Sequence, residues 1–465
     1  MLLKKENKWN SYSKEEKKWA YEFSDYYKIF LDKSKTEREF IKNAIVLAEK
    51  KGFENIENRS KLDVGDKVYY LNREKNLVLV IIGKEDIEKG VKFIVSHVDS
   101  PRLDLKQNPL YEDLELAFFK TNYYGGIKKY QWAAIPLALH GIVILANGEK
   151  KEICIGENEN DPVFTIPDIL PHLSRKIQDD RKSRDVIKGE ELRVLVGSIP
   201  TNIENIEIKE KVKYAILEKL NYEYGMVEED FLSAEFELVP AGKAKDIGFD
   251  RSMIGGYGQD DRICAYTSMI SFLDISKEEN LPNKTIVCYL VDKEEIGSTG
   301  STGLESNYLE YFMSDIIYKL KENYNDYMLK KTLWNSEAIS ADVNVAMDPI
   351  YKSVHDESNA AKLGYGIVVT KYTGHGGKYG ASDADAEFMY KIRDIFNKNN
   401  IVWQTGTLGK VDEGGGGTVA KFLAHFGIKT IDAGPGLLSM HSPFEVSSKL
   451  DLFESFKAYK AFYKY

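Results

Sequence analysis

Short apolar runs rich in β-branched residues punctuate the first hundred positions and predict strands. They lie at residues 68–71, 77–82 and 91–95. The last run leads directly into His97, Asp99 and Pro101, and proline cannot continue a central ladder. His97 and Asp99 are therefore expected at the carboxyl end of a strand.

Two helices are predicted to precede these strands, within residues 13–51. Ser13 with Glu16, and Thr36 with Glu39, have the capping-box spacing, in which a hydroxyl and a carboxylate bond the free backbone N–H groups at a helix start. This part of the chain is interpreted as scaffold.

The pattern changes between about residues 108 and 238, where short alternating segments are punctuated by glycine, as is typical of a β-rich unit. Helix and strand alternation then returns, with a strand expected at 285–291 and a helix at 384–397. The chain is thus predicted to be α/β. A main domain, residues 1–107 and 239–465, has a mixed central sheet flanked by helices, and an inserted β-rich domain, residues 108–238, interrupts it.

Composition excludes several classes of protein. The 465 residues carry a formal net charge of -9, which gives no support for binding a nucleic-acid backbone. Three widely spaced cysteines, Cys154, Cys264 and Cys288, fit a reducing compartment and exclude a disulfide framework. The start of the chain lacks the apolar run of a signal peptide, and no run is long enough to span a membrane. A cytoplasmic location is expected, with no nucleic-acid or membrane partner.

Five segments carry metal-binding side chains where strands or loops are expected to end. They are residues 97–99, 259–262, 292–298, 340–342 and 440–443. Two divalent ions of borderline softness need imidazole nitrogens and carboxylate oxygens, with one carboxylate bridging both ions and one position open to water. Active sites of open α/β sheets gather at carboxyl ends of strands, so the shared placement strengthens signals that are each weak alone.

Two of these segments have ordinary interpretations as caps or turns. His97 and Asp99 stand at i and i+2, so on an extended chain they face the same way and the carboxylate can hold the second imidazole nitrogen. Asp260 and Asp261 begin an expected helix, where an N-cap is the usual role, but a rigidly placed Asp is also suited to bridging two cations. Either Asp260 or Asp261 could bridge.

Glu294 and Glu295 follow the apolar run 286–291, so two adjacent carboxylates lie where the backbone turns. Their side chains point apart, and one could bind metal while the other takes a proton from water. A surface charge cluster is the alternative. Asp342 and His441 also follow apparent strands.

Taken together and in order, these segments resemble the metallo-aminopeptidase family that contains aspartyl aminopeptidase and vacuolar aminopeptidase I. The resemblance spans essentially the whole chain. Its most specific pieces are His97-Val98-Asp99-Ser100-Pro101, Asp292-Lys293-Glu294-Glu295-Ile296-Gly297-Ser298, Ser340-Ala341-Asp342 and Met440-His441-Ser442.

The resemblance implies a zinc-dependent peptide hydrolase with two Zn2+ per subunit, for which Mn2+ or Co2+ could substitute. One zinc would be bound by His97, Asp260 and Asp342. The second would be bound by Asp260, Glu295 and His441, with Asp260 as the bridge. Glu294 would be the general base and Asp99 the residue that orients His97. A metal-activated hydroxide would then attack the first peptide carbonyl.

The resemblance also implies an assembly. The main domain would be catalytic, and the inserted domain would pair subunits and carry His172 into the neighbour's active site as a substrate contact with a possible metal role. Dimers would assemble to a dodecamer. A loop with His375 and Lys378 could approach substrate, although a plain turn is the ordinary interpretation.

The expected function is therefore a metallo-aminopeptidase with neutral or broad specificity for the first residue. The alternatives are an aminopeptidase restricted to N-terminal Asp or Glu, a two-metal carboxypeptidase or deacylase, and a non-catalytic self-assembling protein. The last requires a degenerate site, whereas all five ligand positions and the base are present.

Overall fold

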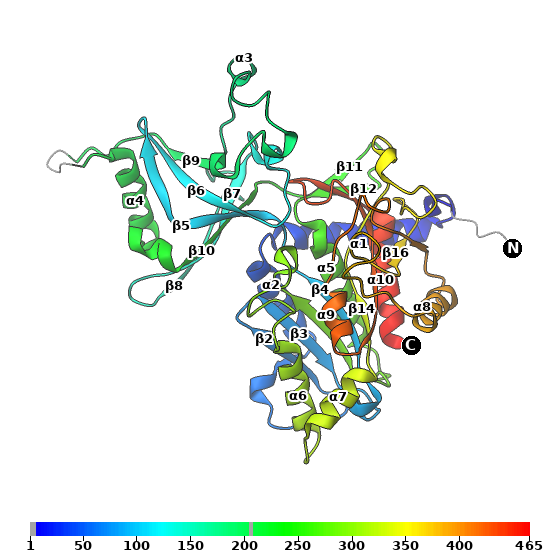
Figure 1. Cartoon of the computed structure of the whole chain (residues 1–465). Helices are drawn as coiled ribbons and strands as arrows, with labels where there is room; N and C mark the ends of the chain where they lie inside the picture. Colours follow the sequence, from blue (N-terminus) through cyan, green and yellow to red (C-terminus); the bar gives the residue numbers. More distant parts are fainter. Residues whose placement is uncertain (1–5, 204–207) are drawn as a thin grey trace. The chain divides into compact units, whose positions relative to one another are not determined.

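The computed structural model describes residues 6–203 and 208–465 and divides into two compact units (Figure 1). Unit 1 holds the described residues of Met1–Ser100, Ala244–Met440 and Phe444–Tyr465. Unit 2 consists of Pro101–Lys243 and His441–Pro443. The two units are described separately.

Unit 1 is built on a nine-stranded mixed sheet. In spatial order its strands are β1 (Glu54–Asn55), β2 (Lys67–Asn72), β3 (Asn76–Ile81), β13 (Ile286–Val291), β4 (Lys92–His97), β14 (Glu337–Ser340), β18 (Lys429–Gly434), β16 (Ile367–Thr370) and β17 (Trp403–Thr405). The four middle strands, β13, β4, β14 and β18, are mutually parallel. Their carboxyl ends therefore meet at one edge of the sheet, where active sites of this class of fold collect.

Both faces of the sheet are covered by helices, so the middle strands are largely buried on both faces. On one face pack α1 (Lys14–Asp32), α2 (Glu37–Glu49), α5 (Gln259–Ile275), α8 (Ala386–Lys398) and α10 (Lys449–Lys464). On the other pack α6 (Tyr308–Leu320), α7 (Asp326–Trp334) and α9 (Ala420–His425). Strand β13 shows the alternation, since Cys288 belongs to the first core and Tyr289 to the second.

A second, five-stranded sheet in unit 1 supports the start of α5. Its order is β11 (Lys245–Ile247), β12 (Met253–Gly256), β20 (Glu445–Ser448), β19 (Gly436–Leu438) and β15 (Asn344–Val345). Gln259 ties α5 to this sheet, because its amide nitrogen donates to the Glu445 carbonyl oxygen at 2.7 Å. Its amide oxygen accepts from the Ser447 hydroxyl at 2.5 Å.

Among its described residues, unit 2 contains a six-stranded antiparallel sheet and the α-helices α3 and α4. The strand order is β8 (Lys150–Ile155), β7 (Leu137–Ile144), β10 (Ala234–Pro240), β5 (Arg102–Asp113), β6 (Leu116–Tyr124) and β9 (Arg193–Gly197), and the helices are α3 (Pro171–Ser174) and α4 (Lys211–Tyr224). The Glu112 carboxylate of β5 caps α4 by accepting the backbone N–H groups of Val212 and Lys213 at 2.8 and 3.0 Å.

The predicted fold class, α/β with a mixed central sheet flanked by helices, is confirmed by this architecture. Both capping boxes are present, at Ser13 and Thr36. The helix expected from Asp260 differs in detail, because Asp260 and Asp261 have non-helical backbone angles. Among the described residues, no helix is long and apolar enough to cross a membrane.

An ion cluster joins three separate parts of unit 1 through Asp246. Its carboxylate lies 2.5 Å from Lys28 Nζ, 2.9 Å from Lys449 Nζ and 2.8 Å from Arg251 Nε. Burial alone would raise the pKa of Asp246, but hydrogen bonds from Lys28, Lys449 and Arg251 outweigh it and lower the pKa. The Lys449 side chain is only 1% exposed, so its charge depends on this carboxylate.

The Asp246→Asn variant should lower the free energy of unfolding by about 3 kcal/mol, because it leaves the buried Lys449 ammonium without its counter-charge. Since the folded-state pKa of Asp246 is depressed, its stabilisation is complete above the ordinary pKa of 3.8 and is lost as pH falls below it. Urea unfolding of both proteins from pH 7 to pH 3 should show the difference narrowing at acid pH.

The Asp25→Asn variant is the matched control. Asp25 also pairs with Lys28, at 3.0 Å, but its side chain is 63% exposed, so its removal should cost less than about 0.5 kcal/mol. Equal effects of the two substitutions would contradict the role given to Asp246.

Candidate metal centre

The sequence-predicted site residues of unit 1 lie where the parallel strands end. His97 is the last residue of β4, with Asp99 two positions beyond it. Glu294 and Glu295 follow β13 in a short 3-10 helix, η8 (Glu294–Ile296). Asp342 follows β14 by two residues. The parallel register brings these loops to the same edge of the sheet.

His97 is buried, and both of its ring nitrogens face oxygen atoms. Nε2 lies 3.3 Å from the Asp260 carboxylate, on the side where a cation would be bound. Nδ1 lies 3.0 Å from the Asp99 backbone carbonyl and 3.3 Å from its carboxylate. The imidazole is thus held through its second nitrogen, as metal-binding histidines commonly are.

Asp99 has a wider role than orienting His97. Its two carboxylate oxygens accept the backbone N–H groups of Glu294 and Glu295, both at 3.2 Å. A side chain after β4 therefore fixes the turn after β13. This turn needs external support because Lys293, which precedes η8, has a φ of 72°.

Asp260 is held by its backbone, which leaves its carboxylate for the site. Its N–H donates to the Glu445 carboxylate at 3.0 Å, and its carbonyl oxygen accepts from the Ser100 hydroxyl at 2.6 Å. Arg262 links the start of α5 to the loop after β4, since its Nε donates to the Val98 carbonyl oxygen at 3.2 Å.

The structure gathers two sets of donor atoms around Asp260. One imidazole nitrogen of His97 and one carboxylate oxygen each from Asp260 and Asp342 lie within 4.8 Å of one another. An oxygen of Glu295 lies within the same distance of an Asp260 oxygen. Imidazole nitrogens and carboxylate oxygens are the donors that Zn2+ prefers in catalytic sites, so these residues fit the ion.

The electrostatics of the cluster also favour a cation. Burial raises the pKa of Asp342 well above its usual range, with added repulsion from Glu294 and Asp260, although His97 opposes the shift. Burial alone would lower the pKa of His97, but Asp260 and Asp99 raise it well above its usual range. A divalent cation would relieve the repulsion between the carboxylates and compete for the His97 nitrogen.

Asp260 and Asp261 differ in their surroundings. Asp260 faces His97, whereas Asp261 is fully buried and belongs to neither set of donor atoms. Burial and repulsion from Asp342 raise the pKa of Asp261 well above its usual range. Of the two, Asp260 is therefore the residue whose carboxylate faces the other donor atoms.

The other sequence-predicted residues belong to unit 2 or to a separate hairpin of unit 1. His441 belongs to unit 2, where its Nδ1 is 2.9 Å from the Gly126 carbonyl oxygen, and His172 is exposed on α3 of that unit. His375 and Lys378 are in a small hairpin of unit 1 in which His375 and Tyr379 exchange backbone hydrogen bonds of 2.9 and 2.6 Å. The structure brings neither His375 nor Lys378 into the sets of donor atoms around Asp260.

Three supporting residues were missed by the sequence reasoning: Ser100, Arg262 and Glu445. Ser100 and Arg262 lie within segments that the sequence analysis names, at residues 97–101 and 259–262, but no role was predicted for them. Glu445 offered none, because it reaches Asp260 from 185 positions away along the chain.

The model of the family described as aminopeptidase I zinc metalloprotease (M18) matches residues 30–463. The chain belongs to the M18 family. It is a zinc-dependent aminopeptidase, and the resemblance inferred from the sequence motifs is confirmed.

Curated M18 relatives match along the full chain. A probable M18 family aminopeptidase 1 of Borreliella afzelii is 60% identical over 99% of this chain and 100% of its own length. The corresponding protein of Thermotoga maritima is 46% identical over 99% of both chains.

Solved M18 structures share the fold. The crystal structure of an M18 aminopeptidase from Thermotoga maritima covers 100% of both chains with a TM-score of 0.93 at 45% identity. Aminopeptidase I from Clostridium acetobutylicum covers the same share with a TM-score of 0.92 at 46% identity. The dodecamer of yeast aminopeptidase 1 matches 96% of this chain and 97% of its own at 22% identity, with a TM-score of 0.77, which shows the fold alone.

Proposed function

We propose that this M18 enzyme releases the N-terminal residue of peptides at a site that holds two zinc ions. The observation that carries the proposal is the gathering of His97, Asp342 and Glu295 around the single carboxylate of Asp260. Asp260 would bridge the ions, with His97 and Asp342 on one and Glu295 on the other. When bound, the two ions would supply a Lewis acid for the peptide carbonyl and lower the pKa of water.

His441 is proposed as the remaining ligand beside Glu295. Within unit 1, β19 and β20 are paired at Leu438 and Val446, so the connection between them is short. Glu445, at its end, is bonded to the N–H of Asp260. A residue of this connection is therefore tethered close to the bridging carboxylate.

Glu294 is proposed as the general base. Its carboxylate lies 4.0 Å from His97 Nε2, and its side chain is 17% exposed, so it borders the donor atoms and still reaches water. It would take a proton from the attacking water and deliver it to the amine that leaves. Asp99 would act as a positioning residue, since it holds both the Glu294–Glu295 turn and His97.

Neutral or broad specificity is proposed over restriction to N-terminal Asp or Glu. Lys378, a cation in the loop that could reach substrate, is already paired with Asp383 at 3.0 Å and lies over the Tyr372 ring at 4.1 Å. A paired lysine offers less to an acidic side chain than a free one.

The assembly is proposed by analogy with the fold neighbours. The solved yeast aminopeptidase 1 is a dodecamer, which supports a homo-oligomer of dimers here. Unit 2 would pair subunits, and its exposed His172 would contact substrate in the partner's site, with a possible metal role. Three free cysteines support a reducing, cytoplasmic location.

The zinc content of two variants should distinguish a ligand that bridges both ions from a ligand that binds only one. The Asp260→Asn variant should lose both ions, because both depend on its carboxylate, whereas Asp342→Asn should lose one. Metal analysis by mass spectrometry after exhaustive dialysis checks this against two zinc ions per wild-type chain. One ion in the wild type, or equal losses in the two variants, would contradict the assignment.

The Glu294→Gln variant should lower kcat on a Leu dipeptide by about 10²- to 10⁴-fold while it keeps its zinc, because the amide cannot accept the proton. Glu305→Gln is the control, since Glu305 is an exposed carboxylate of the same connection and bonds Thr299 instead. Full activity of Glu294→Gln would exclude the proposed base.

A panel of dipeptides with Leu, Lys, Asp or Glu in first place tests the reaction and its specificity. Chelator-sensitive release of the first residue is expected, fastest for neutral residues, and acetylation of the α-amine should abolish it. Turnover of acetylated peptides would favour the deacylase or carboxypeptidase alternative. Turnover of the Asp and Glu peptides alone would favour the acid-restricted one.

A further inference from the structure

The connection that follows β13 carries Glu294 and Glu295, and a buried hydrogen bond closes it at its base. Its two ends are Asp292, the residue directly after β13, and Thr302, which lies 10 positions further along the chain. The Thr302 hydroxyl donates to the Asp292 carboxylate at 2.6 Å. Both side chains are buried, so water does not compete for this bond.

Asn76, the first residue of β3, joins the same two ends through their backbone. Its amide oxygen accepts the N–H of Asp292 at 3.2 Å, and its amide nitrogen donates to the Thr302 carbonyl oxygen at 2.7 Å. β3 and β13 are paired up to Leu77 and Leu290, so Asn76 lies beside the point where β13 ends. Asn76, Asp292 and Thr302 together form what we call the loop clamp.

The connection between the ends of the loop clamp is folded tightly. The N–H groups of Gly297 and Ser298 donate to the carbonyl oxygens of Glu294 and Lys293, at 2.8 and 2.7 Å. A Cβ atom on Gly303 would lie 1.8 Å from the Ser298 carbonyl oxygen, so only glycine fits there. A close-packed segment of this kind transmits a shift at its base to the residues that it carries.

Glu294 is the site residue whose position depends most on this connection. In the proposed site Glu295 is a metal ligand and Glu294 is not, so Glu294 relies on the turn that carries it. The N–H groups of this turn reach Asp99 at 3.2 Å, which is at the long end of the usual range. A general base must lie within hydrogen-bond reach of the water that it deprotonates, so small shifts of the turn matter.

The loop clamp has a cost in stability, which argues against a purely structural role. Burial raises the pKa of Asp292 to about 6, with added repulsion from Glu37 and Asp99. Lys293 and Lys75 oppose the shift. Asp292 Oδ1 has no hydrogen-bond donor among the residues that the structure describes. A buried carboxylate with an incomplete set of donors is destabilising, and such groups are concentrated at functional sites.

We propose that the loop clamp is a positioning device for the aminopeptidase reaction, which holds the turn after β13 so that the Glu294 carboxylate meets the attacking water. Its three residues lie outside the sets of donor atoms around Asp260, so they act through Glu294. This inference rests on the role of general base proposed above for Glu294.

Thr302→Val removes the hydroxyl donor with little change in side-chain shape. It should lower kcat on a Leu dipeptide by about 10- to 100-fold, because a slightly misplaced catalytic group loses about this much. KM should change less than about threefold, since the contacts of bound substrate remain. Thr302→Ser keeps the donor and should restore kcat. Rates are expressed per zinc-loaded chain, so that loss of folded or metal-loaded protein does not enter them.

Thr332→Val is the matched control. Thr332 is fully buried on α7, and its hydroxyl donates to the Met328 carbonyl oxygen of the same helix at 2.8 Å. The variant makes the same change in a buried position of unit 1 outside the connection after β13, so it should keep wild-type kcat.

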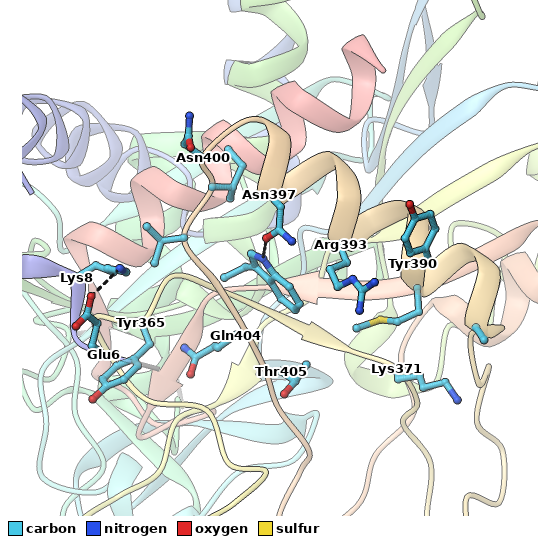
Figure 2. Close-up of a pocket in the computed structure, with 15 residues that line it drawn as sticks. Glu6, Lys8, Tyr365, Lys371, Tyr390, Arg393, Asn397, Asn400, Gln404 and Thr405 are labelled. Carbon is cyan, nitrogen blue, oxygen red and sulfur yellow. Dashed lines mark hydrogen bonds and ion pairs between the residues drawn. The ribbon is translucent and has the colours of Figure 1, made fainter. Parts of the chain in front are cut away.

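Asn76→Asp breaks the loop clamp from β3, because a carboxylate cannot donate to the Thr302 carbonyl oxygen. It should lower kcat in the same way as Thr302→Val. Asn397→Asp is its control, at a position beside β17 and far from β3 in the strand order. Asn397 lines a pocket of about 970 Å3, where its side chain accepts the Trp403 indole N–H at 3.0 Å (Figure 2). A carboxylate keeps that bond, so kcat should not change.

A double-mutant cycle with Glu294→Gln tests whether the loop clamp acts through the base. In the Glu294→Gln background, Thr302→Val should lower kcat by less than about twofold further, because the group that it positions is already gone. A loss as large as in the wild-type background would overturn the proposal. Equal losses in Thr302→Val and Thr332→Val, or in Thr302→Val and Thr302→Ser, would also overturn it.

The Glu294→Gln variant alone separates failure of the loop clamp from failure of the proposed base. Full activity of Glu294→Gln would exclude the base and overturn the loop clamp with it. A low kcat of Glu294→Gln, with wild-type kcat in Thr302→Val and Asn76→Asp, would overturn the loop clamp alone. If neither of these two variants folds, the role of the three residues is structural and the proposal is overturned.

Discussion

The register of β4 between its two parallel neighbours is the constraint on which the candidate metal centre depends. His97 pairs with Val291 of β13, and Val95 pairs with Ser340 of β14, so the three loops that follow leave the sheet at one level. A slip of one residue would turn His97 to the opposite face and separate it from Asp260. Because β4 and its neighbours are buried on both faces, burial alone does not fix this register. The Ser96 hydroxyl, 3.1 Å from that of Ser268 on α5, is a polar contact that a slip would break.

The loops at this edge hold a charge arrangement that opposes folding in the absence of a cation. Burial and mutual repulsion raise the pKa of Asp342 and of Asp261, so folding the metal-free chain must either protonate these groups or bury their charge. The supporting bonds are made largely to backbone groups: Asp99 to the Glu294–Glu295 turn, and Glu445 to the N–H of Asp260. The backbone that carries these site residues is thereby held by side chains from other parts of the chain.

The features that the sequence predicted well are those whose cause is local or whose motif is specific. The capping boxes at Ser13 and Thr36 depend on residues three apart, so their helices could be read directly. α4 is different: its first N–H groups are capped by Glu112, a hundred positions earlier, and no local signal marks its start. The five-stranded sheet of unit 1 likewise joins strands from residues 245 to 448, and it was not predicted.

The candidate site shows the same division. Its residues could be proposed from their types and from the apolar runs before them, but the partner of each carboxylate could not. Asp99 was expected to orient His97. Its carboxylate lies 3.3 Å from His97 Nδ1, and its two oxygens also accept the N–H groups of the turn after β13, a second role that the sequence did not indicate. Which of Asp260 and Asp261 faces the site depends on backbone angles that the sequence did not reveal.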